Sequence, residues 1–390
     1  MKPIFEDTIE SVYLDNAATT MMDEEVVEAM LPYLHERYGN PASPHHLGKD
    51  AEEGVEAARE SVAELLGADT GEIVFTSGGT ESNNWALKCG GRTQQDMTQG
   101  LGGIAICSAI EHSSVLECVT YSDGGLTVPV DNKGRIDMNE LEAIISGRSI
   151  RIVSIQHCNN EIGIIHDIPA IAEIVHESGA LLHVDAVQSF GKWMWDVDDL
   201  GADLVSISSH KIHGPMGVGA LYIKAGTRIS PLLHGGGQEL ERRAGTLAVP
   251  SIVGFGKACE MAWSKIRTEP DRQRELVRKF KNKMEERHGL TFNSGDEGYA
   301  PHIISVNLPG EAQLAAAVLN REYGMCVGTG SACSTKDKKS HVLTAMGMNS
   351  TAQEKVLRIS LSRFNTKGHV DMLAYGIDRA LRELKTRSLV

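Results

Sequence analysis

The chain has few of the features that mark secreted, membrane-spanning or metal-stapled proteins. Its seven cysteines form no Cys-x-x-Cys pair and follow no regular spacing, which argues against a zinc framework and against a disulfide framework. No apolar run approaches the length of a membrane span, and the N-terminal residues are too acidic and too short of apolar length for a signal peptide. The odd number of cysteines fits a reducing compartment. We therefore expect a cytoplasmic protein without a membrane partner.

Positive charge is scarce as well. The 390 residues include 52 Asp and Glu against 38 Lys and Arg, which gives a formal net charge of −14. A protein that binds the phosphate backbone of a nucleic acid needs a basic face, so this balance argues against direct nucleic-acid binding. A local basic patch is still compatible with the total. The length is sufficient for two domains with cores of their own.

What the chain does contain is an alternation of helical and strand patterns through its first two-thirds. The segment from Pro44 to Gly67 carries apolar residues at helical spacing. Helical stretches separate several short β-branched runs, so we expect a mostly parallel sheet covered on both faces. The predicted strands are Glu72–Phe75, Gly103–Cys107, Arg151–Gln156, Leu181–Val184, Leu204–Ile207 and Val218–Ile223.

A long helical pattern over Pro250–Arg287 is interrupted at Arg267–Asp271, where polar residues and a proline predict a break. We place the domain boundary along this pattern, with a large domain over 15–262 and a smaller α+β domain over 1–14 and 263–390. The smaller domain is predicted to contain strands at His302–Asn307 and Leu357–Leu361, a helix at Glu311–Arg321 and a final helix from His369.

Two predicted strand ends carry residues that suit pyridoxal phosphate (PLP). Lys211 follows Ser208, Ser209 and His210 at the end of an apolar strand, where a lysine can form a Schiff base with PLP. Asp185 closes the preceding strand and can keep the pyridine nitrogen protonated, which makes the ring an electron sink. A lone lysine would more simply be a surface residue, and a lone aspartate a turn cap. The two together favour a PLP site.

The turn Thr76–Asn83 follows a strand and opens a helix. Its Gly79 and Thr80 place backbone N–H groups and a hydroxyl at a helix N-terminus, which suits a phosphate. The turn matches neither the dinucleotide fingerprint nor the P-loop. Most glycine-rich turns are only turns, but beside a Schiff-base lysine this one is a candidate phosphate cup.

Three further polar residues follow strands. His112 could stack on a cofactor ring and transfer protons, or simply lie on the surface at the start of a helix. Asn160 and Gln188 could bond the phenolic oxygen of the ring, or cap turns. The loops His234–Glu239 and Arg242–Thr246 are glycine-rich and cationic, so they are either surface loops or reach a phosphate of a neighbouring subunit.

A second chemical centre lies near the C-terminus. Cys333 stands among small residues and is followed by the basic run Lys336–Lys339, and a thiol beside cations is a candidate low-pKa nucleophile, although most single cysteines are inert. Arg358 interrupts an apolar strand. It could clamp a substrate carboxylate with two parallel hydrogen bonds, or form an ordinary salt bridge.

Taken in order, these motifs resemble the cysteine desulfurases, fold-type I PLP enzymes of the class V aminotransferase group. The resemblance extends from Tyr13 to the final helix and rests on the motifs Tyr13–Thr20, Tyr38–Ser43, Thr76–Asn83, Glu111-His112, Asn159–Gly163, His183–Gln188, Ser208–Lys211, His234–Gly237, Arg243–Thr246, Ser331–Cys333 and Arg358.

The resemblance implies an α/β fold, with a large PLP-binding domain built on a mostly parallel seven-stranded sheet flanked by helices, and a smaller domain that carries the cysteine loop. It implies a homodimer in which Lys211 carries the cofactor, Asp185 faces the pyridine nitrogen, and Thr246 reaches the partner's phosphate. Asn160 and Arg358 are expected to bind the substrate. The remaining cofactor-binding residues would be Gly79, Thr80, His112, Gln188, Ser208, Ser209 and His210.

In this family Cys333 would take sulfur from L-cysteine as a persulfide and leave L-alanine. The sulfur would pass to a scaffold or tRNA-modifying protein. The run Ser334–Ser340 is more basic and about one residue shorter than the common form of this subfamily, and it resembles variants dedicated to a single acceptor, such as those for tRNA thiolation. No resident metal is expected, although Cys333 could transiently ligate an iron-sulfur cluster.

Three other functions use the same residues differently. A class V aminotransferase would need the lysine and the phosphate cup but not the Cys333 loop. A selenocysteine lyase also abstracts a chalcogen, so only a comparison of substrates separates it. A non-catalytic scaffold would predict the loss of Lys211 or Asp185, and both are present.

Overall fold

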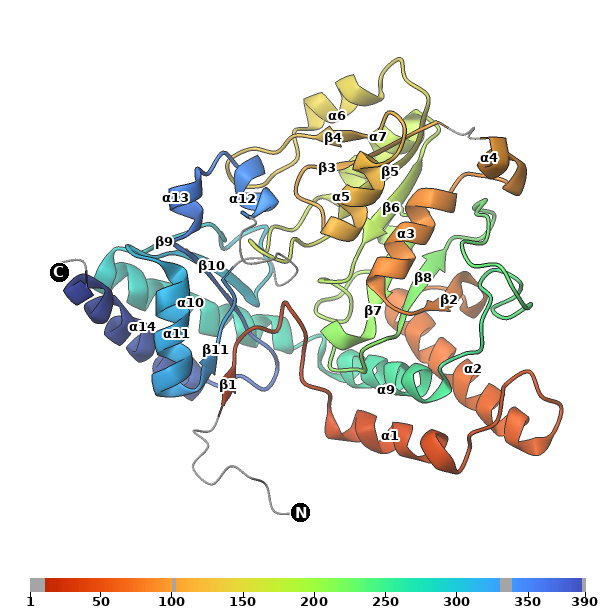
Figure 1. The fold of residues 1–390 in the computed structure, drawn as a ribbon, viewed down its shortest axis with the longest axis horizontal. Helices are drawn as coiled ribbons and strands as arrows, with labels where there is room; N and C mark the ends of the chain where they lie inside the picture. Colours follow the sequence, from red (N-terminus) through yellow and green to blue (C-terminus); the bar gives the residue numbers. More distant parts are fainter. Residues whose placement is uncertain (1–10, 100–102, 330–338, 388–390) are drawn as a thin grey trace.

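The computed structural model describes residues 11–99, 103–329 and 339–387. The chain forms two units that lie side by side, one around a large sheet and one around a small sheet (Figure 1). The large sheet has seven strands, and five of them run parallel from β7 to β4. Its strand order is β2 (Ile73–Thr76), β8 (Gly219–Ile223), β7 (Leu204–Ser208), β6 (Leu181–Asp185), β5 (Ile150–Gln156), β3 (Ile104–Ser108) and β4 (Leu126–Val128).

The predicted mostly parallel sheet is thus confirmed, with β8 antiparallel to both of its neighbours. The sequence-based prediction missed β4, which has only three residues, of which only Val128 is buried. By contrast, all seven residues of β5 are buried. Central strands covered on both faces read as continuous apolar runs, which is why these were found.

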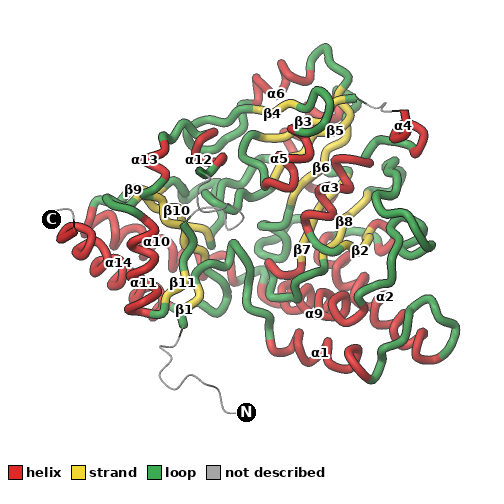
Figure 2. The backbone as a smooth tube through the Cα atoms, viewed as in Figure 1, coloured by secondary structure: helices red, strands yellow, loops and turns green. Residues whose placement is uncertain are grey.

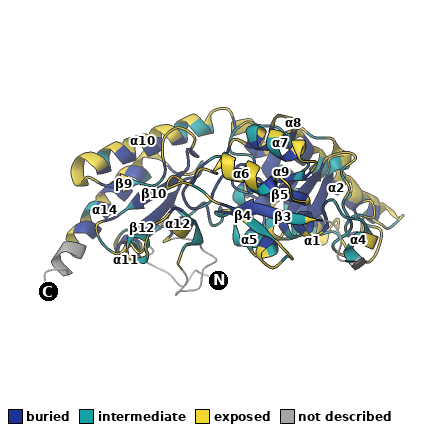
Figure 3. Cartoon of the chain, turned by 90° about the horizontal axis from the view of Figure 1, so that it is seen from above, coloured by how far each residue is buried: buried dark blue, intermediate teal, exposed yellow. Residues whose placement is uncertain are grey.

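Helices cover both faces of the large sheet (Figures 1 and 2). Figure 3 shows the buried strands enclosed between helices whose outer sides are exposed. On one face Phe75 and Val153 belong to the core that includes α2 and α9, and on the other Val74 and Ile152 pack with α3 and α5. The helices of this unit are α1 (Glu24–His35), α2 (His46–Leu66), α3 (Gly79–Cys89), α4 (Gln94–Gln99), α5 (Ser113–Thr120), α6 (Met138–Ile145), α7 (Ile168–Glu177), α8 (Val197–Leu200) and α9 (Val249–Lys265).

The second unit packs helices against an antiparallel sheet. The predicted break in the long helical pattern is present, because α9 ends at Lys265 and α10 starts at Glu269 with Pro270 in its first turn, where a missing N–H costs nothing. Its sheet has the order β12 (Val356–Ser360), β10 (Ile303–Asn307) and β9 (Thr291–Phe292), and its helices are α10 (Glu269–His288), α11 (Ala312–Tyr323), α12 (His341–Ala345), α13 (Ser350–Gln353) and α14 (Lys367–Arg387).

The N-terminal segment packs onto this second unit. Strand β1 (Val12–Tyr13) pairs in parallel with β11 (Met325–Cys326), and Val12 and Leu14 belong to the same core as α10, α11 and α14. The chain then crosses to the large unit through residues 15–20, so this short segment lies between the two cores.

No helix in residues 11–99, 103–329 and 339–387 is both long enough and apolar enough to cross a bilayer. Within the same ranges, no three His, Cys, Asp or Glu side chains are grouped as a metal site would require.

Candidate functional site

A cavity of about 200 Å³ opens where β5, β6 and β7 end and α3 begins. The carboxyl ends of parallel strands meet at one edge of a sheet, which is the usual place for ligands in this architecture. The structure therefore brings together side chains that are far apart in the sequence. The predicted residues that line the cavity are Gly79, Thr80, His112, Asn160, Asp185, Gln188, Ser208, His210, Lys211 and Arg358.

Three predicted site residues are not among the lining. Ser209 is fully buried, and its hydroxyl oxygen lies where a side chain on Gly214 would stand, so it faces away from the cavity. Thr246 is exposed in this chain. Cys333 lies outside the described residues.

Lys211 ends the short 3₁₀ turn Ser209–Lys211 that follows β7. Its Nζ donates hydrogen bonds to the carbonyl oxygens of Ala17 at 2.6 Å and Ala18 at 2.8 Å. Both carbonyls belong to the N-terminal crossing segment, which forms one wall of the cavity. The motif Tyr13–Thr20 signalled this segment in the sequence, but nothing in its residue types indicated a contact with the lysine.

Asp185 ends β6 and is almost completely buried. Asn83 Nδ2 donates to its Oδ2 at 2.8 Å, and the Val187 N–H donates to its Oδ1 at 3.0 Å. The carboxylate therefore cannot rotate without losing one of two hydrogen bonds. Asn83 was part of a predicted motif, yet its link to Asp185 appears only in three dimensions.

A hydrogen-bond chain fixes the tautomer of His112. Asn83 Nδ2 also donates to Ser114 Oγ at 2.9 Å, so the Ser114 hydroxyl is free to donate to His112 Nδ1 at 2.8 Å. The Ser114 N–H also donates to that nitrogen, at 3.2 Å. Nδ1 is thus an acceptor and the proton of the neutral ring lies on Nε2. Burial lowers the pKa of His112, opposed by the nearby Asp185 carboxylate.

The turn before α3 needs its glycines. Gly78 has φ +141°, which side chains rarely adopt, and a Cβ on Gly79 would lie 2.7 Å from Val187 Cγ2. The helix N-terminus can therefore approach a ligand without a side chain in between. Glu81 Oε2 accepts a hydrogen bond from the Ser77 N–H at 2.8 Å, which stabilises the turn.

The cationic loop does not bring its arginines to this cavity. Arg243 forms two hydrogen bonds to the Glu81 carboxylate, at 2.9 and 3.1 Å, and Arg242 donates to the Gly71 carbonyl at 3.0 Å. Both side chains therefore bind protein groups of this chain, and a contact of the loop with a phosphate of a neighbouring subunit stays a prediction. The partly buried Glu81 carboxylate lies within hydrogen-bond distance of Arg243 and neutralises its charge. The sequence did not reveal this pairing.

Arg358 lies on β12 with only 2% of its surface exposed. Its Nη2 donates to Asp15 Oδ1 at 2.7 Å and its Nη1 donates to the Asn160 carbonyl at 3.1 Å. The Nε atom is buried without a partner among the described residues. The salt-bridge alternative is therefore present, and a donor is still left for a ligand.

The donor set fits PLP. Besides Arg358 Nε, the cavity residues Asn83 and Gln188 have buried oxygens, Oδ1 and Oε1, without partners in the described part of the chain. Unsatisfied buried polar atoms in a cavity indicate a polar ligand. A buried carboxylate, a lysine amine and a bare helix N-terminus are what the pyridine nitrogen, the aldehyde and the phosphate of PLP require.

Comparisons with known proteins agree with this geometry. The class-V aminotransferase family model matches residues 12–373. The cysteine desulfurase IscS of Dictyoglomus turgidum is 40% identical, over 97% of this chain and 96% of that protein. The cysteine desulfurase IscS of Methanosarcina thermophila is also 40% identical, over 97% of this chain and 94% of its own length.

Solved structures show the same likeness. A NifS-like protein superposes with a TM-score of 0.87 at 38% identity, over 96% of this chain and 100% of that chain. SspA in complex with cysteine gives a TM-score of 0.78 at 33% identity, over 91% and 99% of the two chains. Class-V aminotransferases and cysteine desulfurases are PLP-dependent enzymes. The chain therefore belongs to the class-V aminotransferase family and, within it, to the cysteine desulfurases.

Proposed function

We propose that this protein converts L-cysteine to L-alanine and passes the sulfur, held as a persulfide on Cys333, to an acceptor protein. The observation that carries the proposal is the convergence of Lys211, Asp185 and Arg358 on one cavity. An amine for the cofactor, a carboxylate for its ring nitrogen and a guanidinium for the substrate carboxylate suit an amino-acid substrate.

Each residue then has a defined task. When bound, PLP supplies an electron sink that stabilises negative charge on the carbons of an amino-acid substrate. Lys211 holds the cofactor and afterwards moves protons at the substrate carbons. Asp185, oriented by Asn83, faces the ring nitrogen. Gly79, Thr80, Ser208 and His210 would surround its phosphate, and Gln188 would lie beside its ring.

His112 is placed to stack on the cofactor and to move a proton near the substrate sulfur. Burial lowers its pKa and so favours the uncharged ring, whose proton lies on Nε2. An uncharged imidazole can both donate and accept protons, which a sulfur leaving step requires.

Arg358 and Asn160 hold the substrate carboxylate. Asp15 positions the guanidinium from one side and the Asn160 carbonyl from another. A guanidinium fixed by two partners has lost most of its rotational freedom before the substrate arrives, so less entropy is lost on binding.

Sulfur transfer belongs to Cys333. Its thiolate attacks the substrate sulfur, a new S–S bond forms, and the substrate C–S bond breaks. The electron pair stays on the carbon, which takes a proton and becomes the methyl group of alanine. No external oxidant is needed, because the carbon keeps the electron pair of the C–S bond. The two-electron reduction of that carbon balances the oxidation of the sulfur in the persulfide.

The quaternary and cellular setting is proposed on the same basis. The protein acts as a cytoplasmic homodimer in which Thr246 completes the partner's phosphate site, and its sulfur serves iron-sulfur cluster assembly or tRNA thiolation. Its large domain spans 15–262, and its small domain spans 1–14 and 263–390. The pairing of β1 with β11 supports the assignment of the N-terminal segment, whereas the break between α9 and α10 favours a boundary a few residues later, after Lys265, which lies in α9 with the large unit.

The decisive experiment gives L-cysteine to the PLP-loaded protein and measures alanine together with trapped thiols. One added sulfur is expected on Cys333 by mass spectrometry. Cys333→Ser should lower alanine production by about 100-fold or more, because a hydroxyl is far less ionised than a thiol at neutral pH. Lys211→Ala should abolish it.

Cys326→Ser is the matched control, since Cys326 is a partly exposed thiol on β11 outside the cavity. It should keep normal activity. Near-normal alanine from Cys333→Ser would refute the proposal and favour an aminotransferase or lyase. A higher kcat/KM for selenocysteine than for cysteine would instead favour a selenocysteine lyase.

A further inference from the structure

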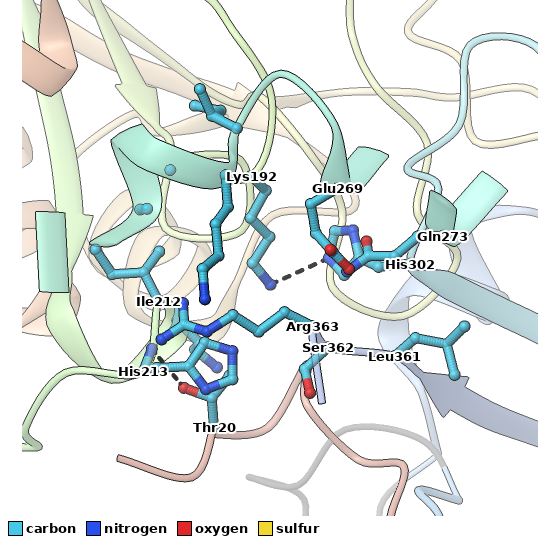
Figure 4. Close-up of a pocket in the computed structure, with 15 residues that line it drawn as sticks. Thr20, Lys192, Ile212, His213, Glu269, Gln273, His302, Leu361, Ser362 and Arg363 are labelled. Atoms are coloured by element: carbon cyan, nitrogen blue, oxygen red, sulfur yellow. Dashed lines mark hydrogen bonds between the residues drawn. The ribbon is translucent and has the colours of Figure 1, made fainter. Parts of the chain in front are cut away.

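A second, smaller cavity lies between the two units of the fold (Figure 4). Lys211 lines both this cavity and the larger one. It offers about 50 Å³, room for one small ion with a few waters. Lys192, after β6, and Lys265, in α9, come from the large unit, whereas His302 and Arg363 come from the small unit.

Positive charge predominates in this lining. Lys192, Lys265 and Arg363 contribute cationic groups, against the single carboxylate of Glu269. That carboxylate is already hydrogen-bonded to Arg272, which does not line the cavity. Arg363 pairs with Asp23 at 2.6 Å.

Lys192 has no carboxylate partner among the described residues. Its Nζ donates to His302 Nε2 at 3.2 Å, and among the described residues it forms no ion pair with a carboxylate. Charges removed from water are normally paired, so a partly buried ammonium beside an imidazole calls for a counter-ion.

The lining also has hydrogen-bond donors without acceptors. Because the ammonium of Lys192 can only donate, His302 Nε2 accepts, and the ring proton of neutral His302 lies on Nδ1. That Nδ1 is buried without a partner in the described part of the chain, and so is Arg363 Nε. His302 is 1% exposed. Unmatched donors beside the Lys192 ammonium complement a ligand that only accepts hydrogen bonds and carries negative charge.

Burial, joined by nearby cations in the case of His213, lowers the pKa values of two groups that line the cavity. Burial lowers the pKa of Lys192 to about 8. Burial also lowers the pKa of His213 to about 3, with Arg363 and Lys192 acting in the same direction and the Met21 carbonyl and Asp23 opposing. A bound anion would stabilise the protonated lysine.

We propose that this cavity binds one small anion of halide size, held by Lys192 and Lys265 of the large unit and by His302 and Arg363 of the small unit. The anion joins the two units behind Lys211. The function of the site is to stabilise the arrangement of the two units on which the larger cavity depends.

The test uses the PLP-loaded protein, so that the cofactor occupies its own phosphate site. Chloride is titrated at constant ionic strength against gluconate, a bulky anion, and the Tm is measured. The Tm should rise by about 2–4 °C and saturate. Crystals soaked in bromide should show anomalous density between Lys192 and Arg363.

Lys192→Met keeps the length of the side chain and removes its charge, so it should lose both the Tm response and the bromide peak. Lys133→Met, at an exposed position, should keep both. His302→Phe is the second variant, should Lys192→Met fail to fold, and it should weaken chloride binding at least about 10-fold by removing the imidazole N–H donor. An equal chloride response in wild type and Lys192→Met, or a cavity with water only after the bromide soak, would overturn the proposal.

Discussion

Asp15 and Arg358 are 343 positions apart in the sequence and form an ion pair of 2.7 Å at the wall of the main cavity. Arg358 is buried, and Asp15 exposes a fifth of its side chain. A Cβ on Gly328 would lie 2.8 Å from Asp15 Oδ1 and 3.1 Å from Arg358 Nε, so the β11 side of this pair admits no side chain. The pair joins the N-terminal crossing segment to the small unit at the point where the substrate carboxylate is proposed to bind.

Asp15→Asn should raise the KM for L-cysteine about 10-fold and leave kcat within about threefold, because the guanidinium loses its orientation but not its charge. Steady-state kinetics measures the changes in KM and kcat separately. Asp271→Asn removes a surface ion pair of 2.6 Å with Arg274 and should change neither constant. A fall in kcat at unchanged KM would mean that Asp15 acts elsewhere.

Asn83→Leu should lower kcat about 10–100-fold while the protein still takes up PLP. The change removes the donor to Asp185 and the donor to Ser114, so both the carboxylate and the His112 tautomer lose their restraint, at about 1.5–3 kcal/mol for a bond to a charged group. Kinetics and the visible absorption band are the measurements. Asn84→Leu is the control. It alters the neighbouring amide, whose Nδ2 donates to the Thr80 carbonyl within α3, and its kcat should be close to that of the wild type.

Thr246 tests the dimer. When Lys211→Ala and Thr246→Ala chains are mixed and allowed to exchange, a mixed dimer has one site with both residues intact and one with neither. About a quarter of all sites should therefore regain full activity. If Thr246 acted within its own subunit, no intact site would form and mixing would restore nothing. A monomer in sedimentation at micromolar concentration would also contradict the prediction.

The free energy of unfolding should fall as the pH drops from about 6.5 toward 4. Burial lowers the pKa of His166 to about 4, so the unfolded state binds the proton first and acid favours unfolding across that window. His166 alone accounts for about 3 kcal/mol over the full window. Urea unfolding of His166→Met should show a shallower pH dependence than wild type.

His35→Met provides the reference, because its side chain on α1 is 72% exposed and solvated in both states. Its pH dependence should match that of the wild type. An identical slope in His166→Met and wild type would show that this histidine is not the group that titrates.

Much of the molecule could be predicted from local pattern. Strands β5, β6 and β7 could be placed from their continuous apolar runs, and α2 from its amphipathic spacing. In each case the residue types of the element itself indicate which of its positions are buried. Strand β4 was missed because three residues carry too little pattern. Motif order likewise placed Lys211 and Asp185 at strand ends.

Contacts between segments that are distant in the chain could not be predicted from the sequence. Nothing in the residue types of 13–20 indicated that the Ala17 and Ala18 carbonyls would accept from Lys211, or that Asn83 would orient Asp185. The pairing of Arg243 with Glu81 was equally hidden, since an arginine in a glycine-rich loop is suited to a phosphate or to a carboxylate.

Local periodicity and residue type were sufficient to predict most of the strands and helices and the identity of the chemical groups. Three features follow from the tertiary structure: which groups meet, which buried donors and acceptors of the described residues are left without partners, and where the cationic cavity lies. Those outcomes depend on how parallel strands align their carboxyl ends and on where two separately formed cores come into contact, and no local pattern encodes either.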